Sequence, residues 1–261
     1  MTRLNLTDNQ LTSVPAELGG LTALRVLDLK GNQLTSVPAE LGGLTALWWL
    51  NLGTNGLTTV PAELGGLTSL EVLTLNRNQL TSVPAALGGL TALRVFDLGD
   101  NQLTSVPAEL GQLTALEALA LSGNLLTSVP AELGSLTALR SLSLNGTQLT
   151  SVPAALGGLT ALTWLRIDRN HLMSMPAAWE KGGAVEQRLE VQVAEARRDL
   201  QVLRAWRADC PGLRALWDEN AAVAAWQGIT IGAAGGAVEG RVGSAVQSSH
   251  NLLTKFQFLI S

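Results

Sequence analysis

The amino-acid sequence predicts an α/β solenoid: a curved parallel β-sheet on the concave face, short helical turns on the convex face, and a helical C-terminal cap. Eight prolines recur with a period of 23 residues, at positions 15, 38, 61, 84, 107, 130, 153 and 176. Each repeat opens with alternating leucines, which is the period of a strand. Each then continues with Pro-Ala-Glu/Ala-Leu-Gly, which is typical of a short helical turn. Stacked repeats of this length bury a continuous core between neighbours.

The strand half of each repeat is read from the copy "LRVLDLKGNQLTSVPAELGGLTA", residues 24 to 46. The alternation predicts that Leu27 and Leu29 point into the core, while residues 26, 28 and 30 point outward. Asn32 recurs in nearly every copy, and a column of amides there is expected to bond the backbone of adjacent turns. Thr147 interrupts this column in the seventh copy, at an expected local cost.

The second half of each repeat is predicted to form the convex wall. The proline is expected at the first helical position, Glu near the positive end of the helix, and Gly-Gly at its stop. Val14, Leu18, Leu21 and their equivalents then close the core.

This repeat resembles the intracellular leucine-rich repeats of the Ras-group type, over roughly residues 1 to 180. The resemblance implies a protein-binding scaffold, in a family where the array is often fused to GTPase, kinase or ligase domains. None of those domains is recognised here. We therefore expect a solenoid over residues 1–181, with about eight repeats of which the first is partial.

Both ends of the array carry expectations of their own. The chain enters the repeat at Arg3 and Leu4 without a preceding cap, which predicts either a missing upstream segment or a frayed first repeat. In a frayed repeat, residues 1 to 12 should exchange their amides quickly. Residues 182–210 read as an amphipathic helix with apolar residues at helical spacing. It is expected either to cap the last repeat or to bind a partner.

Residues 211–261 are similar to the cap that precedes many leucine-rich arrays, through Trp226, Gly228 and the triplet Gly240, Arg241, Val242. Ala245 and Gln247 then stand where that family has leucines. We expect a small helical and strand tail resembling a degenerate cap, and we interpret the chain as a fragment or degenerate product of a longer repeat protein.

Composition excludes several classes of function. The net charge of −4 gives no general attraction to nucleic acid or to anionic membranes. A single cysteine, Cys210, allows no internal disulfide and favours a reducing compartment, so a cytoplasmic location is expected. No apolar run is long enough to cross a bilayer.

A search for chemistry finds little. His171, His250 and Cys210 have no metal-ligand spacing. Residues 232–240 are rich in glycine but lack the Gly-Lys-Ser/Thr that holds phosphates. We predict that the protein is not an enzyme and that it has no catalytic residue, cofactor or metal site.

Variation between the copies collects in the strand half. The convex half is nearly uniform, whereas the outward strand positions and their flanks change from copy to copy. Trp and Arg, which are common in these positions, are enriched in interface hot spots. The candidate protein-binding residues are Arg25, Asp28, Lys30, Trp48, Trp49, Arg77, Arg94, Asp97, Arg140, Trp164, Arg166 and Asp168.

Trp49 is the expected exposed anchor of this surface, and Trp48 its rim. The predicted function is a scaffold that binds a protein or peptide ligand on the concave face. The alternative is a vestigial or truncated fragment with no specific ligand, in which the variation is merely tolerated. Uncovered ends would then favour self-association, detectable as a size that depends on concentration.

Overall fold

The structure is a computed structural model that describes residues 1–173 and 190–191. The chain divides into two compact units, Met1–Gly228 and Ile229–Ser261, and every described residue lies in the first. Its strands are β1 (Arg3–Asn5), β2 (Val26–Asp28), β3 (Trp49–Asn51), β4 (Val72–Thr74), β5 (Val95–Asp97), β6 (Ala118–Ala120), β7 (Ser141–Ser143), β8 (Trp164–Arg166) and β9 (Glu190–Val191). Short 3-10 helices follow seven of them, η1 (Ala16–Gly20), η2 (Ala39–Gly43), η3 (Ala62–Gly66), η4 (Ala85–Gly89), η5 (Ala108–Gln112), η6 (Ala131–Ser135) and η7 (Ala154–Gly158).

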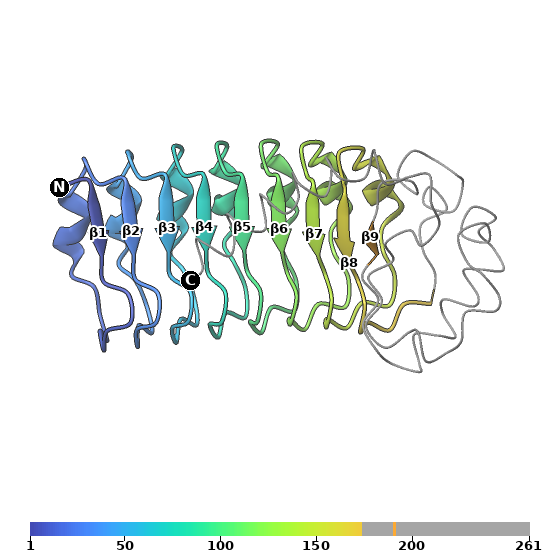
Figure 1. Cartoon of the computed structure of the whole chain (residues 1–261), viewed down its shortest axis with the longest axis horizontal. Helices are drawn as coiled ribbons and strands as arrows, with labels where there is room; N and C mark the ends of the chain where they lie inside the picture. Colours follow the sequence, from blue (N-terminus) through green and yellow to red (C-terminus); the bar gives the residue numbers. More distant parts are fainter. Residues whose placement is uncertain (174–189, 192–261) are drawn as a thin grey trace, which may run out of the picture. The chain divides into compact units, whose positions relative to one another are not determined.

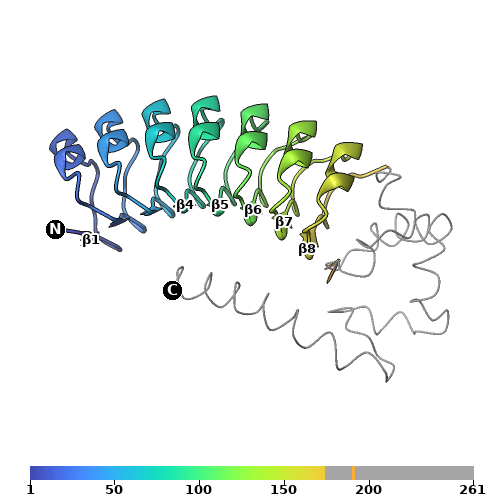
Figure 2. The same cartoon turned by 90° about the horizontal axis from the view of Figure 1, so that it is seen from above.

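The described strands form one parallel sheet in which spatial order equals sequence order (Figure 1). From β1 to β8 the register advances by one repeat per strand, so that Leu27 pairs with Leu4 on one side and with Leu50 on the other. The 3-10 helices lie along the outer side of this array and the strands along its inner side (Figure 2). The prediction of a parallel sheet with short helical turns is confirmed.

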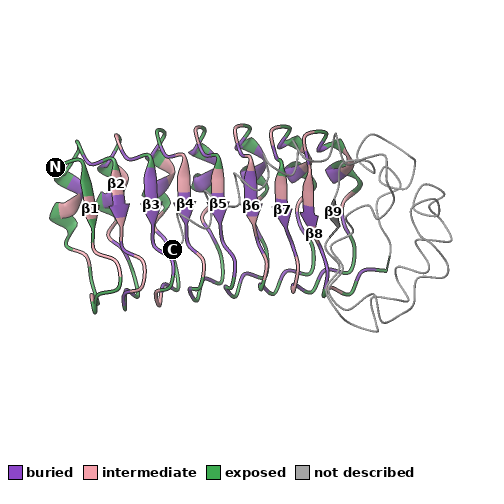
Figure 3. Ribbon diagram, in the orientation of Figure 1, coloured by how far each residue is buried: buried purple, intermediate pink, exposed green. Residues whose placement is uncertain are grey.

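The core runs continuously between the two walls. Leu27 and Leu29 are fully buried, as are most of their equivalents in later repeats, and Phe96 fills one such position in β5. Figure 3 shows the increase in burial away from the first repeat: β1 is mostly exposed, whereas β3 is buried along its whole length. The first repeat is thinner: Leu4, Leu6 and Leu18 are only partly buried, and Leu21 is exposed.

Two details of the convex wall differ from the prediction. Pro15 and its equivalents stand one residue before the helix, in extended conformation, and the Pro15 carbonyl accepts the Leu18 N–H at 3.1 Å. The glycines lie within the helices, whose last cap is a leucine such as Leu21 rather than a left-handed glycine. Gly-Gly is therefore not a stop signal.

The first glycine of each pair is required by packing. A Cβ built on Gly65 would overlap the carbonyl oxygen of Ala86 in the next repeat and lie 2.6 Å from its carbonyl carbon. A Cβ on Gly66 would find nothing nearer than the Gly42 oxygen at 3.8 Å. At this pair the two 3-10 helices thus approach backbone to backbone at the first glycine and not at the second.

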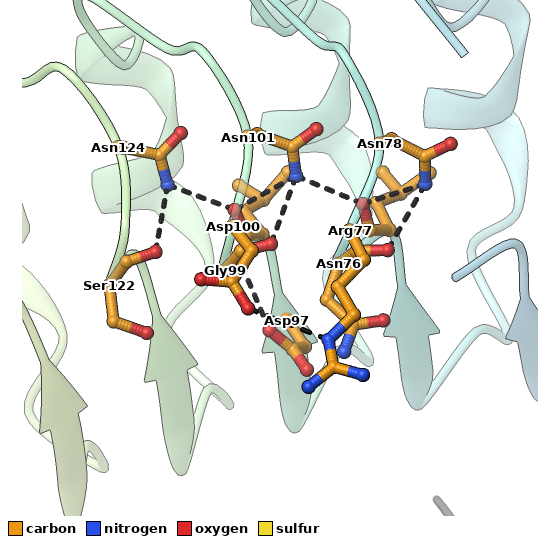
Figure 4. Close-up of polar contacts among 11 residues, drawn as sticks. Asn76, Arg77, Asn78, Asp97, Gly99, Asp100, Asn101, Ser122 and Asn124 are labelled. Atoms are coloured by element: carbon orange, nitrogen blue, oxygen red, sulfur yellow. Dashed lines mark hydrogen bonds and ion pairs between the residues drawn. The ribbon is translucent and has the colours of Figure 1, made fainter. Parts of the chain in front are cut away.

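The predicted column of amides is confirmed. Asn78 donates to the carbonyls of Leu52 and Leu75, both at 3.0 Å, and its Oδ1 accepts the Leu57 N–H at 3.0 Å. Figure 4 shows three successive members, Asn78, Asn101 and Asn124. Each amide bonds its own turn and the preceding one, so the column ties neighbouring repeats together.

The ends of the array match the expectations only in part. Glu190 and Val191 form β9, which pairs in parallel with Trp164 and Leu165 of β8. These two residues of the predicted capping helix 182–210 are thus in a strand. The rest of that helix and the whole tail 211–261 lie outside the described residues.

Candidate functional site

The concave sheet presents two columns of outward side chains, because alternate residues of each three-residue strand point away from the core. The first column takes the first residue of each strand: Arg3, Val26, Trp49, Val72, Val95, Ala118, Ser141 and Trp164. The second takes the third residue: Asn5, Asp28, Asn51, Thr74, Asp97, Ala120, Ser143 and Arg166. From β2 to β6 the first column is an unbroken apolar stripe, which we call the stripe.

The register brings the stripe together across five strands. Val26 lies beside Trp49, Trp49 beside Val72, Val72 beside Val95, and Val95 beside Ala118. The candidate residues predicted from sequence did not include the valines. Their signal was present, because a strict period of 23 residues aligns equal positions of neighbouring repeats.

The two adjacent tryptophans differ in exposure from the expectation. Trp49 is 5% exposed, whereas Trp48 is 38% exposed on the border just before β3. The Trp49 indole N–H has no hydrogen-bond partner among the described residues. The expectation of Trp49 as the exposed anchor is therefore wrong, and Trp48 is the more accessible indole.

Trp48 belongs to a third column along the strand entry, which we call the edge column: Arg25, Trp48, Glu71, Arg94, Glu117, Arg140 and Thr163. Arg94 donates from Nε to Glu117 Oε1 at 2.8 Å, and Arg140 Nε lies 4.0 Å from Glu117 Oε2. The hydrogen bond and charge of Glu117 raise the pKa of Arg94, which stays protonated. Glu117, absent from the predicted set, thus occupies both arginines, while Arg25 is exposed beside Trp48.

The second column carries carboxylates and amides that bond their own backbone. Asp28 Oδ1 accepts the Lys30 N–H at 3.1 Å, and Asn51 Oδ1 accepts the Gly53 N–H at 3.0 Å. Asp97 Oδ1 accepts the Gly99 N–H at 2.9 Å. Each bond closes the turn that leaves the strand.

Asp97 differs from Asp28, the other carboxylate of this set, because it is only 6% exposed whereas Asp28 is half-buried. Burial raises the pKa of Asp97 to about 6, with a further rise from the charge of Asp100. The Gly99 hydrogen bond and the charge of Arg77 act in the opposite direction. Arg77 pairs instead with Asp100, at 3.6 Å between Nε and Oδ2 (Figure 4).

The remaining predicted residues lie at the last described repeats. Trp164 and Arg166 are half-buried in β8, and Asp168 follows as a buried side chain. Asp168 lies 3.5 Å from Arg166 and 3.9 Å from Arg169. The predicted set is therefore spread along the whole sheet rather than gathered at one point.

Within residues 1–173 and 190–191, no group of three His, Cys, Asp or Glu side chains is arranged to hold a metal ion. In that same part of the chain, no helix has the length and apolarity that crossing a bilayer needs. The surface offers contact area and charge.

Comparisons with known proteins agree with this geometry. Residues 2–106 match the family described as "Leucine-rich repeat region", and residues 114–172 match "Leucine rich repeat". No curated protein matches the amino-acid sequence of this chain.

Three solved structures are similar to this one. A leucine-rich repeat protein of Leptospira interrogans is 32% identical, with a TM-score of 0.65 over 75% of this chain and 50% of that one. The ectodomain of the Arabidopsis thaliana receptor kinase GASSHO1/SCHENGEN3, in complex with CASPARIAN STRIP INTEGRITY FACTOR 2, is 36% identical (TM-score 0.64; 72% and 24% covered). The PEPR1–AtPEP1 structure is 31% identical (TM-score 0.62; 66% and 25% covered).

This chain thus spans half the length of the first of these proteins and about a quarter of the other two. The family matches at residues 2–106 and 114–172 lie within the repeat array. Through that array, the chain belongs to the leucine-rich repeat family.

Proposed function

We propose that the protein is a non-enzymatic interaction scaffold whose concave sheet binds a protein or peptide ligand. The observation that carries the proposal is the contrast between the two walls. Side chains that touch the next repeat hardly change along the array, whereas the edge column changes at every strand and the stripe changes at every step except that from β4 to β5.

The composition of the concave side fits a protein ligand. Val26, Val72 and Val95 are half-buried, and Trp48 stands exposed at their border. Such an apolar centre beside polar and charged groups is the usual anatomy of a protein interface. Charges of both signs, Arg25 and Glu71 among them, argue against a track for nucleic-acid phosphates.

The structural relatives support the same class of ligand. Two of them are recorded with a bound partner, CASPARIAN STRIP INTEGRITY FACTOR 2 in one case and AtPEP1 in the other. Leucine-rich repeat arrays are typically non-enzymatic. With its single cysteine, the protein is best suited to a reducing compartment such as the cytoplasm.

The test is capture of a partner from a lysate of the source cells, with two double variants of the full chain. Trp48→Ala with Arg25→Ala changes two exposed edge positions without opening the core. Glu40→Ala with Glu63→Ala is the matched control, on exposed positions of η2 and η3. Loss of an anchor typically costs about 2 kcal/mol of binding or more, so the edge variant should retain at least tenfold less partner.

The control variant should retain as much partner as the wild type, and both variants should melt within a few degrees of it. Equal retention by all three proteins would contradict a concave binding site. It would favour the alternative of a repeat array without a specific ligand.

A further inference from the structure

Asp97 lies near the middle of the concave sheet, and only one of its two carboxylate oxygens accepts a hydrogen bond from the described residues. Oδ1 accepts the Gly99 N–H at 2.9 Å, while Oδ2 accepts no hydrogen bond and joins no ion pair among the described residues. The residue as a whole is nevertheless only 6% exposed, which leaves Oδ2 at the surface of a largely desolvated side chain. A carboxylate in this condition has lost water and gained one hydrogen bond.

The neighbours of Asp97 along its column are small and uncharged. Thr74 of β4 and Ala120 of β6 lie beside it in register. On the entry side, Val95 lies two residues before it on β5, with Val72 and Ala118 next to Val95 on the adjacent strands. A ligand group at Asp97 would therefore have apolar surface directly next to it.

The charges nearest to Asp97 do not neutralise it. On the exit side, the Arg77 guanidinium pairs with Asp100. On the entry side, Arg94 is bonded to Glu117, and Glu71 is also negative. Among the described residues close to β5, each arginine is thus paired with a carboxylate other than that of Asp97.

We propose that Asp97 is a specificity-determining residue, which pairs with one lysine or arginine of a partner peptide whose flanking apolar residues rest on Val72, Val95 and Ala118. This inference rests on the proposed concave binding function and names the chemistry that the ligand must carry. A ligand cation at Oδ2 would form the ion pair that Asp97 lacks among the described residues. Because the carboxylate is already largely desolvated, its pairing requires little further loss of water.

Other carboxylates on the sheet do not share this environment. Asp28 holds the equivalent position in β2 but is half-buried, next to the turn that carries Lys30. Asp168 has Arg166 and Arg169 within 4 Å. In β3 the equivalent residue is Asn51, which makes the same turn bond without a charge.

Asn51 also shows that Asp97→Asn is a clean variant. An amide oxygen accepts the N–H two residues later at 3.0 Å in β3, as the Asp97 carboxylate does in β5. Asp97→Asn therefore preserves the turn and removes only the charge. Asp28→Asn is the matched control, because it makes the same change in the same column at a site with different surroundings.

The experiment pans a random peptide library, displayed on phage, against the full wild-type chain at pH 7. Peptides enriched on the wild type should contain a lysine or arginine flanked by apolar residues. They should bind Asp28→Asn as tightly as the wild type and Asp97→Asn at least tenfold more weakly. For a carboxyl group whose pKa is near 6, the ionised fraction falls about tenfold from pH 7 to pH 5. Wild-type affinity should fall by that factor, and the weak binding of Asp97→Asn should not.

Two results would overturn the proposal in distinguishable ways. Peptides that bind the Asp97→Asn protein unchanged, but lose affinity with Trp48→Ala and Arg25→Ala, would refute the role of Asp97 and leave the concave function standing. Failure of any peptide to enrich on the wild type, or binding that none of these variants affects, would refute both.

Discussion

Restoring the missing amide at position 147 should stabilise the array. In the regular repeats each asparagine makes two bonds to the preceding repeat, as Asn78 does with the Leu52 carbonyl and the Leu57 N–H. The Thr147 hydroxyl can donate to the Leu144 carbonyl within its own repeat or to Asn170 Oδ1 in the next repeat, and it makes no bond to the preceding repeat. The chain thus lacks, at this one step, the two bonds that would reach Leu121 and Leu126.

The backbone at this step already has the geometry that an amide needs. The Gln148 N–H bonds the Leu126 carbonyl at 2.9 Å, as Gln102 bonds Leu80 two repeats earlier. Thr147 is 4% exposed, so water offers little replacement. With a net value of about 0.5–1.5 kcal/mol per bond, Thr147→Asn should add roughly 1–3 kcal/mol to the free energy of unfolding.

Two measurements check this expectation. Thermal unfolding should shift upward by at least ~2 °C, given about 2–4 °C per kcal/mol for a chain of this size. The Leu126 amide should exchange more slowly, which localises the effect to the repaired step. An unchanged melting temperature with unchanged exchange at Leu126 would refute the reasoning, and Thr147→Ala serves as the control that adds no amide.

Three further predictions concern single positions. Thr54 is an exposed β-branched residue at φ 53°, so Thr54→Gly should raise stability by about 1 kcal/mol in chemical denaturation, whereas a loss would contradict strain at this turn. Gly65→Ala should lower the free energy of unfolding by about 1–3 kcal/mol, because the new methyl group would overlap the next repeat. The control Gly66→Ala should leave the free energy of unfolding unchanged or raise it slightly. Equal effects of the two substitutions would rule out the close contact. Because the folded pKa of Asp97 is about 6, above an unfolded value of about 3.9, its contribution to stability is fully present below pH 4 and is lost as pH rises through 6. The free energy of unfolding of Asp97→Asn should therefore exceed that of the wild type by roughly 3 kcal/mol at pH 7 and by little at pH 4. A difference that does not vary with pH would contradict a raised pKa.

The period of the sequence predicts the register because equal positions of consecutive repeats must lie side by side. Leu27 beside Leu50 and the bonds of the amide column follow directly from that spacing. Contacts between turns are harder to predict, since they depend on how closely two backbones approach. The first glycine of each pair is never replaced in the seven full copies, while the second becomes Gln112 and Ser135. This contrast indicates a close backbone contact at the first glycine. The interpretation of Gly-Gly as a single stop signal does not distinguish the two glycines and so does not predict that contact.

Side-chain exposure on the concave sheet could not be predicted from the pattern alone. The alternation assigns Trp49 to the outward column correctly, yet only 5% of it is exposed. The column to which a residue belongs predicts the direction of its side chain. It does not predict how much of that side chain the neighbouring residues cover. Ion pairs such as Arg94 with Glu117 join positions 23 residues apart, and they depend on which charges happen to stand in adjacent copies.

Variation along the concave columns does not by itself distinguish a selected surface from a tolerated one, because outward positions contribute little to stacking. Asp97 does bear on that choice. Drift at a position with no ligand should favour residues that cost the fold nothing, and Asn51 shows that an uncharged residue completes the same turn. Asp97 instead keeps a buried carboxylate with one oxygen unpaired among the described residues, at an expected cost of roughly 3 kcal/mol at neutral pH. A charge that weakens the folded chain at this point is what a surface built to meet a cationic partner requires.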